Sequence, residues 1–196
     1  MGLRPPLKVA VMVSGRGSNL RALQEEAPEQ GYVITGVVSN NPTAPAVDYA
    51  RDQGLAVRLV DHRRFATRAA FEETLATALD DLAPDIIALA GFLRVLGADF
   101  VGRYQGRLLN IHPSLLPAFP GLDTHRRALA SGARVHGATV HLVTDAVDGG
   151  PIIAQAGLTV IPGEPPAALA ARVLALEHAL YPYVLGRWAR GEIADR

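Results

Sequence analysis

"VAVMVSGRGSNL", residues 9 to 20, contains the junction that decides the fold. Its first five residues are apolar and rich in valine, which is typical of a strand buried on both faces. A glycine-rich loop follows, and a helical pattern then runs over residues 19–26. Strand, glycine loop and helix in this order open a β-α-β unit, the repeating unit of a parallel sheet.

The same alternation continues along the first half of the chain. Four more short apolar runs predict buried strands, at 33–38, 57–60, 86–90 and 108–111. Between them, helical spacing predicts helices at 44–53 and 67–82, the second with Phe71, Leu75 and Leu79 on its apolar face. Since crossovers between parallel strands are right-handed, we predict an α/β fold. Its sheet is doubly wound and mostly parallel, with a Rossmann-like N-terminal half.

The pattern changes in the second half of the chain. Apolar runs at 138–143 and 152–160 flank a turn-rich segment and predict a hairpin-like pair of strands at the far side of the sheet. Pro165 and Pro166 then begin a long helix that reaches the region of Trp188. Because the chain has neither a repeat nor a linker-like tract, we predict one domain over residues 1–196.

Composition excludes several classes of protein. Lys plus Arg equals Asp plus Glu at 19 each, so no basic surface for nucleic acid is indicated. The chain has no cysteine, which excludes disulfides and thiolate metal sites and fits a reducing compartment. The apolar stretch near the N-terminus is too short for a signal sequence or a membrane span. We therefore expect a cytoplasmic protein that binds neither nucleic acid nor membrane.

The loop from Ser14 to Asn19 has the composition of an anion site. Glycines let the backbone approach an anion, and the following helix offers free N–H groups. The third glycine of a dinucleotide fingerprint is replaced by Leu20, and no Gly-Lys-Ser/Thr sequence of a P-loop is present. Two interpretations remain: a site for one small phosphate, or a tight turn with Ser18 or Asn19 as the helix N-cap.

Polar residues end two of the predicted strands, where doubly wound sheets bind their ligands. The segment Gly91 to Arg94 follows one strand, and Asn110 and His112 end the next. Being two residues apart, Asn110 and His112 point to the same side of the strand. An amide can hold an oxyanion, and an imidazole can pass a proton at neutral pH.

The carboxylate of such a site would come from Asp145 or Asp148, in the turn after the 138–143 run, although both could also be only turn residues. No Ser, Cys or Lys in these motifs has the setting of an activated nucleophile, so direct transfer between two bound substrates is indicated. His136 and His141, five apart on a strand, are expected on opposite faces, and His62 and His125 in loops. With no HExxH motif, no metal is expected.

Seven segments together resemble the phosphoribosylglycinamide formyltransferase family, the folate-dependent formyl transfer enzymes of purine synthesis. These segments are "SGRGSNL", "SNNPTAPA", "LAGFLRVL", "LLNIHPSLLPAFPGLDTHRRAL", "HGATVHLV", "DAVDGGPII" and "LEHALYP". The resemblance as a whole runs from about Lys8 to Ile193. The Asn-x-His-Pro-Ser motif and the later Asp-Gly-Gly-Pro are specific to formyl transfer from folate.

The resemblance implies a function for residues at matching positions. Asn110, His112 and Asp148 match the catalytic residues. The ribonucleotide side is matched by Gly17, Ser18, Asn19, Ile111, Pro113 and Glu177. The folate side is matched by Arg68, Leu93, Arg94, Val95, Leu96, Asn110, Thr144, Asp145, Ala146, Val147 and Asp148. The implied co-substrate is 10-formyltetrahydrofolate, with no metal, acting on glycinamide ribonucleotide in a monomer or homodimer. One departure is apolar residues 174–176, where some relatives carry a polar residue for the phosphate.

The sequence fits related formyl transfer activities less well. A methionyl-tRNA formyltransferase would need a further basic domain, and a formyltetrahydrofolate hydrolase usually carries an N-terminal regulatory domain. Sugar-amine formyltransferases lack the Gly-Ser-Asn loop. A nucleotide-binding module without catalysis would leave the Asn, His and Asp residues without a use. We therefore expect formyl transfer through a tetrahedral intermediate.

Overall fold

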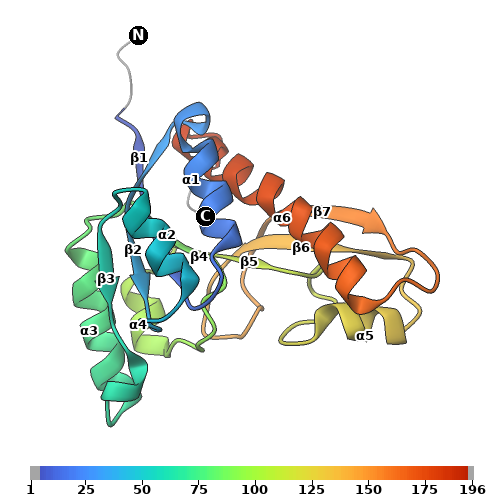
Figure 1. The fold of residues 1–196 in the computed structure, drawn as a ribbon, viewed down its shortest axis with the longest axis horizontal. Coiled ribbons are helices and arrows are strands. Elements are labelled where there is room, and N and C mark those ends of the chain that lie inside the picture. Colours follow the sequence, from blue (N-terminus) through green and yellow to red (C-terminus); the bar gives the residue numbers. More distant parts are fainter. Residues whose placement is uncertain (1–4, 194–196) are drawn as a thin grey trace.

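The computed structural model describes residues 5–193, which build a seven-stranded sheet (Figure 1). Its spatial order is β3-β2-β1-β4-β5-β6-β7. Strands β1 to β5 are parallel, whereas β6 pairs antiparallel with both β5 and β7. The strands are β1 Leu7–Val13, β2 Tyr32–Ser39, β3 Val57–Leu59, β4 Ile86–Leu89, β5 Leu108–His112, β6 Val135–Leu142 and β7 Ile152–Thr159. The predicted doubly wound, mostly parallel sheet and its antiparallel pair are confirmed.

Helices cover both faces of the sheet. On one face α1 (Ser18–Gln30), α2 (Pro45–Asp52) and α6 (Pro166–Ala189) pack into one apolar cluster, while α3 (Arg68–Asp80) and α4 (Ala98–Arg103) pack into a second on the other face. A short α5 (Thr124–Ala130) lies beside α6 (Figure 1). Strand order reverses between β1 and β4, so the carboxyl ends of these strands form the switch point where such folds bind ligands.

The buried part of the central strand β1 is apolar because both of its faces are covered by helices. Val9, Val11 and Val13 enter the α1–α2–α6 cluster, and Ala10 and Met12 enter the α3–α4 cluster. All five are fully buried. Each large side chain so buried contributes roughly 1.5–3 kcal/mol of transfer free energy. The strand is thereby fixed between two layers of helices, as its sequence predicted.

Several local predictions were wrong. The segment at 57–60 was expected to be buried, but β3 is the edge strand and its residues are half-buried or exposed. Two short helices, α4 and α5, were not predicted, and neither was the 3₁₀ turn η1 at His62–Arg64. His125, expected in a loop, lies in α5. Helices of six or seven residues show too few turns to give a clear apolar period.

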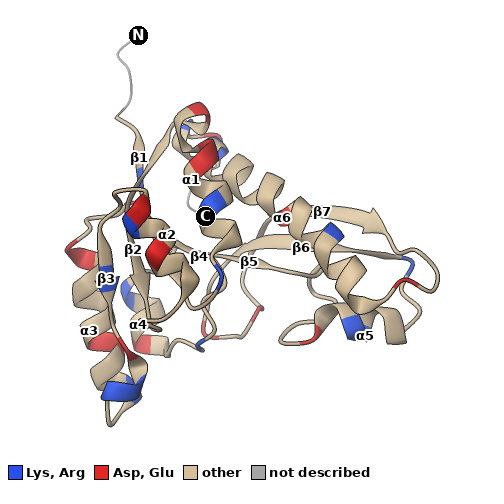
Figure 2. Ribbon diagram, viewed as in Figure 1, with Lys and Arg blue, Asp and Glu red and all other residues tan. Residues whose placement is uncertain are grey.

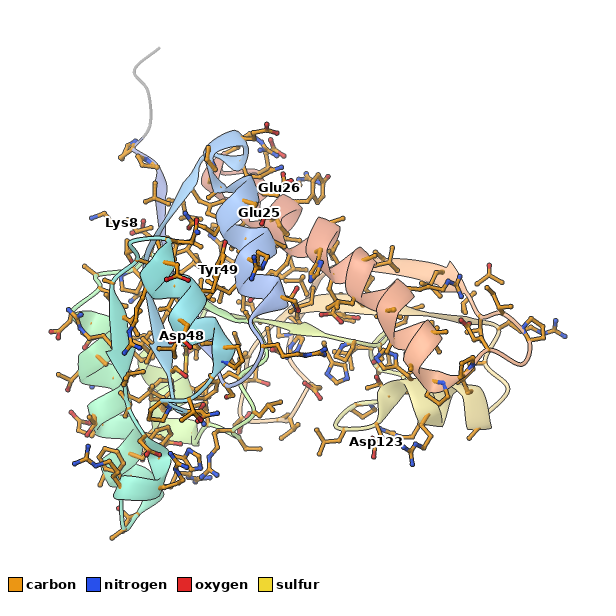
Figure 3. All side chains as sticks on the ribbon, viewed as in Figure 1. Lys8, Glu25, Glu26, Asp48, Tyr49 and Asp123 are labelled. Atoms are coloured by element: carbon orange, nitrogen blue, oxygen red, sulfur yellow. The ribbon has the colours of Figure 1, made fainter. Side chains whose placement is uncertain are left out.

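The N-cap of helix α1 is not one of the two residues named in the tight-turn interpretation. Its N-cap is Gly17 with φ 79°, without any side-chain cap, rather than Ser18 or Asn19. A Cβ on Gly17 would lie 2.6 Å from the Cβ of Ala46, so the loop packs directly on the first turn of α2. Further along, Arg21 of α1 stacks 4.3 Å over the ring of Tyr49 on α2. Figure 3 labels this tyrosine together with Glu25 and Glu26 of α1.

Charged residues of both signs are distributed over the same elements (Figure 2). Figure 2 shows basic and acidic residues mixed on the same helices, in keeping with the equal totals of 19 each. Within residues 5–193, no helix has the length and apolar character needed to cross a membrane.

The packing of Gly17 on Ala46 gives a first prediction. Gly17→Ala should lower the free energy of unfolding by about 1–3 kcal/mol, because a left-handed backbone and a close contact must both be accommodated. Gly15→Ala in the same loop is the matched control, since a Cβ there meets nothing within 4 Å. Urea denaturation of both variants measures the difference. Equal stability of the two variants would contradict this account of the loop.

Candidate active site

The pairing of β5 with β6 gathers polar side chains on one face of the sheet. Leu109 and Ile111 of β5 enter the core below α6, so the alternate residues Asn110 and His112 project from the opposite face. His141 of β6 lies directly across from Asn110. The Nδ2 atom of Asn110 is 3.2 Å from Nε2 of His141. Asn110 and His112 therefore share a side, as the sequence predicted.

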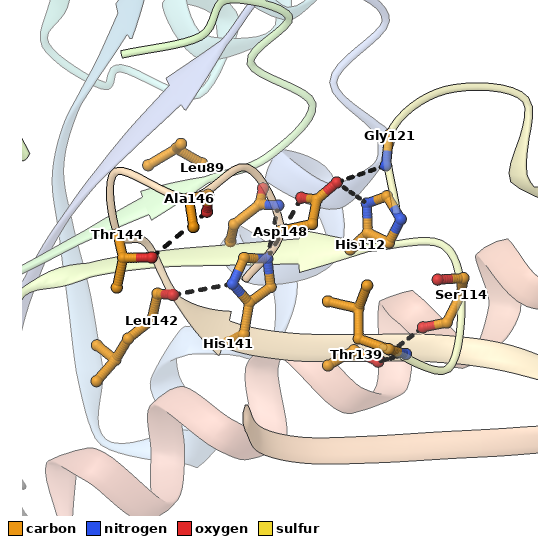
Figure 4. A network of polar contacts seen from close by, with 12 residues as sticks. Leu89, His112, Ser114, Gly121, Thr139, His141, Leu142, Thr144, Ala146 and Asp148 are labelled. Carbon is orange, nitrogen blue, oxygen red and sulfur yellow. Dashed lines mark hydrogen bonds and ion pairs between the residues drawn. The ribbon is translucent and has the colours of Figure 1, made fainter. Parts of the chain in front are cut away.

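Asp148 completes this cluster from the turn after β6 (Figure 4). Its Oδ2 accepts a hydrogen bond of 2.8 Å from the Gly121 N–H and lies 3.4 Å from Nδ1 of His112. Its Oδ1 lies 3.6 Å from Nε2 of His141. The backbone of Asp148 has φ 52°, a left-handed conformation that Asp and Asn tolerate better than most residues. The sharp turn presents the carboxylate to both imidazoles.

Gly150 explains why a glycine closes the turn. A Cβ at this position would lie 1.9 Å from the carbonyl oxygen of Leu142, so the turn returns tightly against the end of β6. A larger residue would push the backbone away and carry Asp148 with it. The glycine is needed for the close approach of two backbone segments.

Asp148 is held in its ionised form. Its pKa is lowered, first by the contact with His141, and further by the Gly121 N–H and the nearby His112, against the opposing effect of burial. The imidazole of His112 has an acceptor at each nitrogen, since Nε2 is 3.0 Å from the Phe119 carbonyl oxygen and Nδ1 faces Asp148. Only a doubly protonated ring can donate to both. The surroundings of His112 thus suit an imidazolium.

The loop after His112 is anchored by a buried polar network. The Thr139 hydroxyl donates to the Ser114 carbonyl at 2.7 Å and accepts from the Leu116 N–H at 3.0 Å. The amide of Gln155 donates to the same hydroxyl and to the Leu116 carbonyl. This network joins β6 and β7 to the loop that supplies the Phe119 and Gly121 partners of the cluster, and so limits how far they can shift.

Most residues matched to the ribonucleotide side lie on the α1–α6 face. Asn19 donates from Nδ2 to Oε2 of Glu177 at 2.7 Å, which joins the start of α1 to the middle of α6. Burial raises the pKa of the Glu177 carboxyl, and the hydrogen bond from Asn19 only partly opposes it. Gly17 and Ser18 precede Asn19 at this helix start. Ile111 packs into the same apolar cluster as Val173 of α6, and Pro113 directly follows β5.

The residues matched to the folate side come from three segments. Leu93, Arg94 and Val95 are exposed after β4, whereas Leu96 is buried. Val143, which precedes the 144–148 turn, packs against the cluster that contains Leu96. In that turn, Thr144 is half-buried and Asp145, Ala146 and Val147 are exposed. Leu93, Val95 and Val147 are among the large apolar side chains exposed to solvent.

Arg68 lies at the end of the Leu93–Leu96 segment. A Cβ on Gly97 would lie 3.2 Å from its guanidinium, and Glu72, 3.7 Å from Arg68, accepts a hydrogen bond from the Gly97 N–H. The side chain of Arg68 is 61% exposed. A cavity of about 300 Å³ opens near this segment, lined by Ser14, Asn40, Asn41, His62, Arg63, Leu93 and Arg94. It adjoins the segment matched to folate but is not lined by Asn110, His112 or Asp148.

His141 is the residue that sequence reasoning missed. Its side chain is 2% exposed and contacts both Asn110 and Asp148. Its place across from Asn110 depends on the register between β5 and β6, which periodicity alone does not give.

His136 lies outside this cluster, 3.2 Å from His125, and burial lowers its pKa to about 4. Within residues 5–193, no group of three or more His, Cys, Asp or Glu side chains is arranged to hold a metal ion.

The fold and the cluster define a doubly wound α/β enzyme whose acid–base groups lie at the carboxyl end of a central strand. A model of the formyl transferase family matches residues 7–185. The chain therefore belongs to the formyl transferase family.

Individual relatives agree with this assignment. The chain is 43% identical to phosphoribosylglycinamide formyltransferase of Escherichia coli over 95% of its length and 89% of that protein. It is 39% identical to the human trifunctional purine biosynthetic protein adenosine-3, over 95% of the chain but only 19% of that larger protein. Among solved structures, phosphoribosylglycinamide formyltransferase from Coxiella burnetii superposes with a TM-score of 0.92 at 44% identity, covering 95% of this chain and 88% of that one. The enzyme from Brucella melitensis gives 0.90 at 45% identity, covering 97% and 100%.

The buried Glu177 gives a prediction for stability. Because its pKa is raised in the folded state, the ionised carboxyl destabilises the fold at neutral pH, and this cost disappears as the pH falls below its ordinary value of 4.5. Glu177→Gln removes the charge and keeps an oxygen to accept from Asn19. The variant should unfold at pH 7 at the same temperature as the wild type or a higher one, and its advantage should shrink toward pH 4.5. A variant clearly less stable at pH 7 would contradict this.

Proposed function

We propose that this enzyme transfers the formyl group of 10-formyltetrahydrofolate to the amine of 5'-phosphoribosylglycinamide. The observation that carries the proposal is the cluster of Asn110, His112 and Asp148 at the end of β5, together with family membership and the names of the relatives. The cluster offers an amide donor, an imidazole with a charged partner and no nucleophile of its own. Such a set suits direct attack of one substrate on the other.

The reaction then balances with these three residues. The amine nitrogen attacks the formyl carbon, a new C–N bond forms, and the carbonyl oxygen becomes an oxyanion. Asn110 and the imidazolium of His112 stabilise this oxyanion. When the tetrahedral intermediate collapses, the bond from the formyl carbon to N10 of the folate breaks. The proton lost by the amine is delivered to N10, and Asp148 keeps His112 suited to that exchange through its negative charge.

The ribonucleotide contacts are proposed from the loop and from α6. Backbone N–H groups of Gly17, Ser18 and Asn19 hold the phosphate, as the start of a helix favours an anion. Glu177, positioned by Asn19, accepts hydrogen bonds from the ribose hydroxyls. Ile111 and Pro113 line the path between the loop and His112. Leu174, half-buried on α6, supplies no charge for the phosphate.

The folate contacts are proposed from the segments after β4 and β6. Leu93, Arg94, Val95 and Leu96, with residues 144–148, form an apolar slot whose backbone groups bind the pterin edge. Arg68 faces the glutamate carboxylate near solvent. Exposed ion pairs contribute about 1 kcal/mol or less, so Arg68 adds to binding rather than to the chemical step. We also propose a single formyltransferase domain over residues 1–196, a cytoplasmic location, and a monomer or homodimer without a metal.

One assay tests the proposed activity. Purified enzyme is given 10-formyltetrahydrofolate with glycinamide ribonucleotide, water alone or an amino sugar, and both products are quantified. Formylation of the ribonucleotide at a rate far above hydrolysis, and no formylation of the sugar, is the expected result. Release of formate without transfer would replace the proposal by a hydrolase, and preference for the sugar would replace the acceptor.

The charge of Asp148 can be tested separately. Asp148→Asn keeps the shape and tolerates the left-handed backbone at φ 52°. The variant should lose roughly 10²-fold or more in kcat, the usual scale for acid–base assistance, while KM for the ribonucleotide changes little. Near-normal kcat in this variant would reduce Asp148 to a turn residue.

A further inference from the structure

His141 has hydrogen-bond partners at both ring nitrogens. Nδ1 lies 2.9 Å from the carbonyl oxygen of Leu142, and Nε2 lies 3.2 Å from Nδ2 of Asn110. A carbonyl oxygen can only accept, so the proton of a neutral His141 is on Nδ1. The lone pair on Nε2 is then free to accept a hydrogen bond from the amide of Asn110.

The other neighbour of Nε2 makes the opposite demand. Asp148 Oδ1 is 3.6 Å away, farther than the amide of Asn110 at 3.2 Å, and a proton on Nε2 would serve this carboxylate instead. Without that proton Asp148 still has the Gly121 N–H at 2.8 Å and the ring of His112. The shorter contact, to the amide of Asn110, therefore decides that Nε2 carries no proton.

Charge balance favours the same state. The side chains of His112, His141 and Asp148 are 7%, 2% and 11% exposed, and among residues 5–193 Asp148 is the carboxylate that contacts both imidazoles. A second buried imidazolium would leave one positive charge without compensation, which is costly in a poorly solvated site. His112, with an acceptor at each nitrogen, is the imidazole suited to carry the charge. His141 is then neutral.

We propose that His141 is a positioning residue for formyl transfer: its unprotonated Nε2 accepts from the Asn110 amide and holds that amide with its NH₂ group as the donor. An amide has two faces of similar shape, and a rotation of 180° exchanges its oxygen and nitrogen. With Nδ2 held by His141, one N–H is used there and the second remains for the oxyanion. If the amide were free to rotate, its oxygen would face the developing negative charge in part of the molecules. This inference rests on the proposed function of Asn110.

Two variants test the hydrogen bonds of the two ring nitrogens separately. His141→Asn keeps a donor near the Leu142 carbonyl and removes the acceptor for Asn110, whereas the longer His141→Gln can place its oxygen near the position of Nε2. We expect His141→Asn to lower kcat about tenfold or more, less than the 10²–10³ lost when an oxyanion donor is removed outright. Both KM values should stay within about threefold of wild type, and His141→Gln should recover most of the lost kcat.

The same series can overturn the proposal. Unchanged kcat in His141→Asn would show that Asn110 needs no acceptor there. Equal losses in both variants, together with equal falls in melting temperature, would show that His141 only fills space.

A measurement on the unmodified protein does not depend on activity. With ¹⁵N-labelled histidine and asparagine, NMR should show a proton on Nδ1 of His141 at the pH of the assay, and a scalar coupling between its Nε2 and Nδ2 of Asn110. A proton on Nε2 would overturn the proposal whatever the kinetics. A wild type that fails to formylate the ribonucleotide would instead refute the proposed function and leave the tautomer assignment to the spectrum.

Discussion

The antiparallel register of β6 on β5 is the constraint on which the site depends. It sets His141 across from Asn110 and Thr139 across from His112, so that four side chains share one face. A shift of one residue would turn His141 into the core and replace it with an apolar neighbour. The alternate residues of both strands are buried under α6 and hold the register firmly. The chemistry of one face is therefore secured by hydrophobic packing on the other.

Within that frame a single carboxylate organises two imidazoles. Asp148 approaches one with each oxygen, and Oδ2 also accepts from the backbone of the loop after β5. Two imidazoles with one anion cannot both be charged without cost, so the hydrogen bonds of each ring decide which carries the proton. His112 has an acceptor near each nitrogen, whereas His141 has an acceptor at Nδ1 and, at Nε2, an amide donor that lies closer than Asp148. The difference between two chemically identical side chains thus arises from their partners.

Much of the fold and part of the site could be predicted from the sequence. Buried parallel strands are apolar throughout, and the shared side of Asn110 and His112 follows from a period of two. His141 could not be found in this way, because its role depends on pairing between strands about thirty residues apart. The exposure of β3 depends on its place at the edge of the sheet, which periodicity does not report. The cap at Gly17 reflects the close approach of α2, a tertiary contact.

The carboxyl groups of Asp148 and Glu177 differ in what their surroundings favour. Asp148 has hydrogen-bond donors and imidazoles around it, and its pKa is lowered. Glu177 has one amide donor in a largely apolar setting, and its pKa is raised. Stabilisation of the first supports the fold at neutral pH, whereas ionisation of the second opposes it. Glu177 is therefore not explained by stability. A carboxylate that destabilises the fold beside the start of α1 is consistent with a group that accepts hydrogen bonds from a hydroxyl-bearing ligand. The hydroxyl groups of such a ligand would replace the hydrogen bonds to water that the carboxylate loses on folding.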